Sequence, residues 1–154
     1  MSVNRRAALD QAIRRLYQVI SFGEGGTPDW AGMRSLFAVG ARITRITPEA
    51  VDALDLPGFQ AMFTELIECG AVLSFFEYET GRRVELFGAV AHVLSSYETK
   101  RSPEALIPFG QGINSIQLLW TADGRSVVSL LWDEGLPAAI PAVAPLEVSY
   151  GNAA

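Results

Sequence analysis

The fold of this chain is decided by RVELFGAVAHVLSSYETK (residues 83–100), GINSIQLLW (112–120) and RSVVSLLWDE (125–134). Aliphatic, β-branched and aromatic residues dominate each segment, as they do in β-strands. The last two segments flank Asp123-Gly124, a dipeptide typical of β-hairpin turns. The stretch therefore predicts three long strands joined as an antiparallel meander.

Helices are predicted before these strands. Residues 5–22 place Leu9, Ile13, Leu16 and Ile20 at helical spacing. At three later points a hydroxyl residue, a proline and an acidic residue follow one another. This order is typical of a helix start, because it combines an N-cap, a fixed φ and a carboxylate near the positive end of the helix dipole. These start signals are Thr27-Pro28-Asp29, Thr47-Pro48-Glu49 and Ser102-Pro103-Glu104.

Each start signal predicts a helix or a turn, and strands are predicted between them. The first predicts a short helix through Leu36. The second predicts a longer helix that is interrupted at residues 56–58 and resumes through Ile67, and the third a single turn inside a loop. Strands are predicted over residues 38–46 and 71–79, with a hairpin signal at Thr80-Gly81.

The order of the elements defines the fold class. Two helices, a strand, a further helix and four antiparallel strands predict an α+β domain. Long twisted strands after amphipathic helices indicate a sheet curled around a helix, with a pocket at its open end. One domain is expected over residues 1–135, followed by a Pro- and Ala-rich C-terminal tail over residues 136–154.

Composition excludes several classes of function. The net charge is −5 and the basic residues are scattered, which argues against a nucleic-acid partner. No apolar run reaches the roughly 18 residues that cross a bilayer. Residues 1–15 lack the apolar centre of a signal peptide, so a cytoplasmic protein is expected. Cys69 is the only cysteine, which excludes an internal disulfide, and we expect a small buried side chain there.

No metal or cofactor site is predicted. One histidine and one cysteine are too few for the usual transition-metal ligand sets. Glu24-Gly25-Gly26 lacks the Lys and Ser/Thr of a phosphate-binding loop. The Gly-x-Gly at residues 110–112 precedes a strand and is interpreted as a loop hinge.

Strand alternation predicts which side chains share a face. In the long strand, Ser95 and Tyr97 fall on one face and His92 on the other. A two-residue turn at Asp123-Gly124 would put Ser115, Gln117 and Leu119 on one face with Val128, Leu130 and Trp132. A three-residue turn would invert that pairing, so the sequence leaves both registers open.

Both faces of these strands are largely apolar, so the second face should also be covered. A second copy of the chain is the simplest cover. A homodimer is therefore expected, with Leu94, Ile116, Leu118, Trp120 and Leu131 at the centre of its interface.

The element order, together with FGAVAHVLSSYETK, GINSIQLLW and DGRSVVSLLWDE, is similar to the nuclear transport factor 2-like (NTF2-like) superfamily, in its SnoaL-like and ketosteroid-isomerase-like group. The resemblance covers about residues 5–134. It implies a cystatin-like cone of curved antiparallel sheet wrapped around the N-terminal helices, dimerisation through the outer face and a small molecule bound inside. Some members are isomerases, dehydratases or cyclases and others have no catalytic role, so the fold does not select an activity. Comparison with these relatives implies that Ala91, Val93, Ser95, Tyr97, Ser115, Gln117 and Trp132 face inward.

The cone cavity should have an apolar lining and a polar end. Such a lining selects for a small, largely apolar molecule with one or two hydrogen-bonding groups. The expected apolar lining is Phe37, Phe63, Val93, Leu130 and Trp132. The expected ligand-binding residues are Tyr17, Trp30, Ser95, Tyr97, Ser115, Gln117 and Trp132.

Catalysis of proton transfer would need an acid or base in this cavity. The inward sets of the last two strands, as assigned, contain no Asp or Glu, so binding of a small molecule without chemistry is favoured over the alternative, an isomerase, dehydratase or cyclase. His92 and Asp29 are the catalytic candidates, although His92 is interpreted first as an outward-facing residue and Asp29 as a helix-capping carboxylate. Arg42 is either a solvated edge residue or a receptor for an anionic ligand. The two functions are distinguished by whether an Asp, Glu or His lies deep in the cavity within hydrogen-bond reach of a second polar group.

Overall fold

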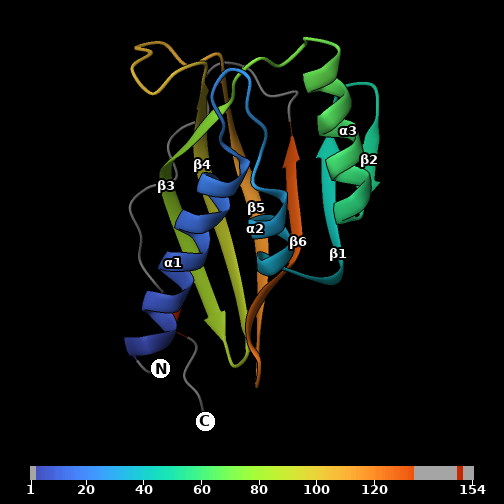
Figure 1. The fold of residues 1–154 in the computed structure, drawn as a ribbon. Coiled ribbons are helices and arrows are strands. Elements are labelled where there is room, and N and C mark those ends of the chain that lie inside the picture. The colour runs from blue at the N-terminus through green and yellow to red at the C-terminus, as the bar shows by residue number, and fades with distance from the viewer. Residues whose placement is uncertain (1–2, 134–148, 151–154) are drawn as a thin grey trace.

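The computed structural model describes residues 3–133 and Ser149–Tyr150. Within that part of the chain three helices lie on one side of a mixed sheet, and α1 crosses its inner face (Figure 1). The helices are α1 (Val3–Ile20), α2 (Trp30–Leu36) and α3 (Leu56–Glu68). The strands are β1 (Phe37–Ile46), β2 (Val51–Leu54), β3 (Phe76–Phe87), β4 (Val90–Lys100), β5 (Gly110–Thr121), β6 (Gly124–Asp133) and β7 (Ser149–Tyr150).

The strands follow the order β2-β1-β6-β5-β4-β3-β7 across the sheet. β3, β4, β5 and β6 form the predicted antiparallel meander. β1 joins β6 in parallel, and β7 joins β3 in parallel, so the sheet is mixed where the sequence predicted an antiparallel one. The predicted α+β class is confirmed.

The prediction that a helix starts at Thr47-Pro48-Glu49 is wrong. Thr47-Pro48-Glu49 belongs to the loop of the β1–β2 hairpin, which Thr47 closes by accepting the Ala50 N–H at 3.1 Å and donating its own N–H to the Ala50 carbonyl. α3 starts later, where the Asp55 carboxylate accepts the Gly58 N–H at 2.8 Å. A Thr side chain that accepts a backbone N–H can begin either a helix or a turn. Here residues 47–50 form a turn, because β2 pairs with β1 directly after them.

The hairpin predicted at Thr80-Gly81 is also wrong. β3 continues through these residues, and the register against β4 shifts between Glu79 and Gly81, which makes a β-bulge. The chain reverses instead at Gly88, whose φ of 55° suits glycine. The predicted strand over residues 83–100 is therefore the end of β3, a tight turn and β4.

A second bulge decides the register between β5 and β6. Leu118 pairs with Val127, whereas Gln117 pairs with Ser129, so Val128 has no partner in β5. Beyond this bulge Ile116 lies opposite Leu130 and Asn114 opposite Trp132. The assignment of Ser115 and Gln117 to the inner face was wrong, because the sequence carries no sign of the extra residue.

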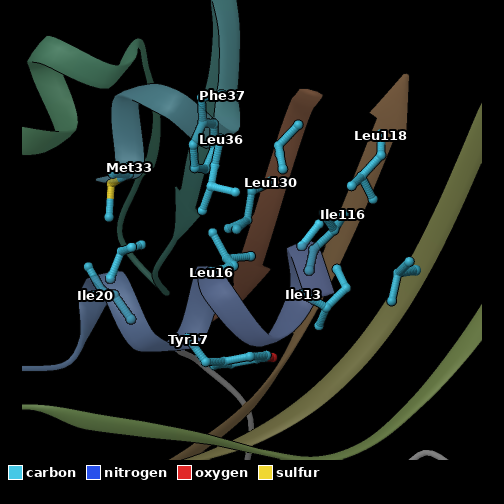
Figure 2. Close-up of a cluster of buried hydrophobic side chains, with 14 of the residues drawn as sticks. Ile13, Leu16, Tyr17, Ile20, Met33, Leu36, Phe37, Ile116, Leu118 and Leu130 are labelled. Carbon is cyan, nitrogen blue, oxygen red and sulfur yellow. The ribbon is translucent and has the colours of Figure 1, made fainter. Parts of the chain in front are cut away.

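The core lies between α1 and the inner face of the sheet. Ile13 and Leu16 of α1 point towards Ile116 and Leu130 (Figure 2). Ile13 and Ile116 are fully buried, as are Ala91 and Val93 of β4. Small side chains at such positions let a helix approach the sheet closely.

Two further expectations concern Cys69 and the tail. Cys69 caps the C-terminal end of α3 and is exposed, so the prediction of a buried thiol was wrong. Of the tail expected over residues 136–154, Ser149–Tyr150 pair with β3, and the rest lies outside the described residues. Among the described residues no helix has the length and apolar character needed to cross a membrane.

Candidate functional site

A cavity of about 370 Å³ lies between the helices and the inner face of the sheet. One side of it, here called the apolar wall, consists of the aromatic side chains Phe59, Phe63, Phe75 and Trp132. The other side, here called the polar wall, presents Glu77 of β3 and Asn114 of β5. The remaining lining residues are Leu16, Ile20, Met33, Phe37, Ile43, Arg45, Met62, Leu66, Tyr97, Thr99, Phe109, Gly110, Gln111 and Leu130.

The apolar wall is held by ring contacts between elements. The Phe63 ring lies 5.8 Å from Phe59 within α3 and 5.5 Å from Phe75, just before β3. The Phe59 ring meets Trp132 of β6 edge-on at 6.0 Å. The Phe59–Trp132 and Phe63–Phe75 pairs are edge-to-face, and such pairs attract one another beyond simple area burial, so this wall has a defined shape.

Two glycines of β5 leave room for side chains of β4. Gly110 and Gly112 lie on the same face at the start of β5, where Gly110 is opposite Thr99 of β4 and Gly112 is opposite Tyr97. A Cβ atom on Gly112 would collide with the Tyr97 ring, and one on Gly110 with the Thr99 hydroxyl. These glycines therefore admit two cavity-lining side chains, and the interpretation of residues 110–112 as a loop hinge was wrong.

Glu77 is placed by the junction of α1 with β3. Phe22, just after α1, exchanges two backbone hydrogen bonds with Phe75, at 2.7 and 2.9 Å. The Glu77 N–H donates to the Ser21 hydroxyl at 3.0 Å. Strand alternation then sends the Glu77 side chain inward, opposite Thr99 of β4.

Asn114 joins Glu77 to a buried tyrosine. Its Nδ2 donates to Glu77 Oε1 at 3.1 Å and to the Tyr17 hydroxyl at 3.3 Å. Tyr17 projects from α1, and its hydroxyl lies 2.6 Å from Ser95 Oγ. Ser95 donates in turn to Glu79.

Burial raises the pKa of the Glu77 carboxyl from its ordinary value of 4.5 to about 7, against the opposing effect of the Asn114 hydrogen bond. Burial, reinforced by the nearby Glu77 carboxylate, also raises the pKa of Tyr17. Tyr17 is therefore a neutral hydroxyl at physiological pH. Glu77 can both hold and release a proton there, as a general acid or base requires.

The structure brings part of the predicted site together. Tyr97 and Trp132 line the cavity, as do Phe37, Phe63 and Leu130 of the expected apolar lining. Tyr17 and Ser95 lie directly behind the polar wall. The prediction that Val93 lines the cavity was wrong, because Val93 is fully buried in the core.

The remaining predicted ligand-binding residues lie elsewhere. Ser115 and Gln117 are on the outer face of the sheet, where Ser115 Oγ lies 3.0 Å from His92 Nε2. Trp30 packs among the core aromatics, with its ring 6.1 Å from Phe59. Trp30 therefore contacts the apolar wall without lining the cavity.

The catalytic and anion-binding candidates also lie outside the cavity lining. His92 pairs with Gln117 on the outer face. Asp29 caps α2 by accepting the Gly32 N–H at 2.8 Å and pairs with Arg15 at the surface. Arg42 is exposed on β1, and Arg45, three residues further along the chain, lines the cavity.

The expected dimer centre changes with the register. Ile116 and Leu118 are buried against α1, so they cannot belong to an interface between copies, and Trp120 packs partly against the same core. Leu94 and Leu131 face outward, on either side of Ser115. The homodimer stays a prediction with a smaller apolar centre.

Two residues of the site were missed. Glu77 lies in the predicted strand over residues 71–79, and Asn114 lies in GINSIQLLW. A signal for Glu77 exists, because Glu77 and Glu79 are two apart on that strand and so share one face. Asn114 depends on the register and has no such signal. Within the described residues no group of His, Cys, Asp and Glu could hold a metal ion.

No protein-family model matches the chain, and no curated protein matches its sequence. Solved structures do match its fold. A protein of unknown function with a cystatin-like fold from Nostoc punctiforme superposes with a TM-score of 0.66 at 9% identity, over 86% of this chain and 92% of that one. A candidate aromatic ring hydroxylase from Novosphingobium aromaticivorans gives 0.65 at 13% identity, over 89% and 93%.

A candidate dehydratase of the NTF2-like family from Streptomyces avermitilis gives a TM-score of 0.62 at 13% identity, over 85% of this chain and 96% of that one. At such low identities the likeness concerns the fold alone. The chain has the NTF2-like, cystatin-like fold that its sequence resembles.

Proposed function

We propose that this protein is an enzyme that binds a small, largely apolar molecule in the cavity and moves a proton on it with Glu77. The observation that carries the proposal is a carboxyl group at the wall of a largely apolar cavity, hydrogen-bonded to Asn114 at 3.1 Å. This is the feature that distinguishes an acid–base enzyme from a binding protein of the same fold, so the enzyme alternative now takes precedence.

The cavity supports a substrate class. A volume of about 370 Å³ is near the lower end for small-molecule sites, and its aromatic lining suits a flat or ring-shaped apolar body. Its polar groups are few, which disfavours sugars and nucleotides because these need many partners. A ring compound with one carbonyl or hydroxyl group fits these constraints.

The chemistry follows from the position of Glu77. Its carboxylate removes a proton from a carbon next to the substrate carbonyl, so that the C–H bond breaks, an O–H bond forms on Glu77 and the electron pair moves to the carbonyl oxygen. Tyr97, Thr99 and Arg45 are polar residues of the same lining that can approach that oxygen. Return of the proton from Glu77 to another carbon gives an isomerisation. If Glu77 instead gives the proton to a β-hydroxyl, the C–O bond breaks, water leaves and a C=C bond forms, which is a dehydration.

Hydrogen exchange tests the proposal without a known substrate. A panel of small cyclic ketones is incubated with the protein in heavy water, and deuterium uptake next to the carbonyl is followed by NMR. Glu77→Gln should lower the protein-dependent rate by about 10²-fold or more. Glu85→Gln, the same change at an exposed site on β3, should leave the rate unchanged.

Binding is measured separately on the same panel. A ligand that binds only the folded protein raises its stability by about 2.7 kcal/mol at a hundred times its dissociation constant, which a thermal shift detects. Ligands that bind equally to wild type and Glu77→Gln, with no exchange in either, would return the protein to the class of binding proteins.

A further inference from the structure

The hydrogen bonds behind the polar wall form one chain with a fixed direction. Glu79 accepts the Ser95 hydroxyl proton, because a carboxylate can only accept. Ser95 Oγ therefore accepts from Tyr17, 2.6 Å away, and the Tyr17 oxygen is left to accept from Asn114. The same Asn114 nitrogen, carrying two hydrogens, donates its second one to Glu77.

The far end of the chain is anchored by charge. Arg82 Nε donates to Glu79 Oε1 at 2.9 Å, and Arg82 Nη2 approaches the same oxygen at 2.5 Å. Arg82 Nη1 also pairs with Asp10 of α1 at 2.6 Å. The Glu79 and Arg82 side chains are only 19% and 17% exposed, so solvent screens this pair little. Glu79 does not line the cavity.

An amide side chain has two nearly isosteric orientations. In the observed one Asn114 presents an N–H to the Glu77 carboxylate, which stabilises its charged form. In the flipped one the amide oxygen would face that carboxylate and favour its protonated form. Whatever fixes the amide therefore sets the proton affinity of Glu77.

We propose that Glu79 is a positioning residue, which acts through Ser95 and Tyr17 to hold the Asn114 amide with its N–H towards Glu77. This inference rests on the proposed role of Glu77. Glu79 itself stays outside the cavity, so it shapes the reaction without touching a substrate.

Removing the Ser95 hydroxyl breaks the chain without changing any charge. All the ionisable residues that share a pocket lining with Glu77 remain in Ser95→Ala: Arg14, Tyr17, Arg45, Tyr78, Glu79 and Tyr97. Ser96→Ala is the matched control. It deletes the hydroxyl of the adjacent buried serine, which bonds to Thr80 and the Gly81 carbonyl instead.

The readout is the pKa of Glu77, obtained by NMR titration of protein with ¹³C-labelled glutamate carboxyls, with Glu77→Gln assigning the signal. The titration needs no substrate, so its outcome is independent of the deuterium exchange assay. The positioning role of Glu79 can therefore fail while the proposed function stands, and the proposed function can fail while the positioning role stands. We expect Ser95→Ala to raise the pKa of Glu77 from about 7 to about 8, and Ser96→Ala to leave it unchanged. An unchanged or lower value in Ser95→Ala, or an equal rise in both variants, overturns the proposal.

Glu79→Met separates positioning from simple electrostatics. Loss of a nearby negative charge alone would lower the pKa of Glu77, whereas release of the Asn114 amide would raise it. A rise supports the proposal and a fall overturns it. If Ser95→Ala does not fold, Tyr17→Phe replaces it, because it removes the next hydroxyl of the same chain and is expected to give the same rise.

Discussion

The two walls of the cavity are built by different physics. The apolar wall is a set of rings from α3, from β6 and from Phe75 just before β3, and their positions follow from packing. The polar wall is a carboxyl and an amide held by hydrogen bonds that continue to an ion pair between β3 and α1. Packing decides what can enter such a site, and directed hydrogen bonds decide what can happen there.

Damage to the apolar wall should have the larger effect on stability. Phe63 is buried and its ring meets Phe22, Trp30, Phe59 and Phe75. Phe63→Ala should lower the free energy of unfolding by about 3 to 5 kcal/mol, measured by urea denaturation. Phe87→Ala, the same substitution at a 76% exposed site, should cost less than about 0.5 kcal/mol. Equal losses in the two variants would contradict this account of the wall.

The free energy of unfolding should fall as the pH rises, because of the Glu77 carboxyl in the polar wall. The folded protein keeps the Glu77 proton up to a pKa of about 7, whereas the unfolded chain releases it near 4.5. The folded state therefore binds more protons between these values, and the stability that this gives is lost as the pH rises through that window. Glu77→Gln cannot ionise, so its free energy of unfolding should not fall in this way. Between pH 4 and pH 8 the free energy of unfolding of Glu77→Gln should therefore rise relative to that of wild type by up to about 3 kcal/mol.

Urea denaturation of wild type and Glu77→Gln at pH 4, 6 and 8 checks this expectation. Glu85→Gln serves as the control, because that exposed carboxyl lies outside the cavity. A difference between wild type and Glu77→Gln that does not change with pH would mean that the Glu77 carboxyl titrates normally.

The sequence predicted the layout better than the site, for physical reasons. Helical periodicity and long apolar strands are repeated over many residues, so the element order survives local errors. Which face of β5 points inward depends on one unpaired residue, Val128. The facing of the second half of β3 depends on the bulge at Glu79–Gly81. Such bulges are set by tertiary packing, and the one at Val128 decided whether Asn114 or Ser115 shares a face with Leu130 and Trp132.

The smallest effect is expected where a sequence candidate proved to be a cap. Asp29→Ala removes one N-cap hydrogen bond and an exposed ion pair with Arg15, and should cost about 1 kcal/mol. Asp55→Ala removes the corresponding cap of α3 and should cost about as much. Neither change should affect deuterium exchange on the ketone panel, whereas a selective loss in Asp29→Ala would restore Asp29 as a catalytic residue.

The central claim is that the polar wall holds a carboxyl able to exchange a proton near neutral pH. A ¹³C NMR titration of Glu77 in the wild-type protein, assigned with Glu77→Gln, measures this property directly. The account predicts a pKa of about 7. A value near the ordinary 4.5 would show a solvated carboxylate, and the cavity would then have no acid–base group matched to its surroundings.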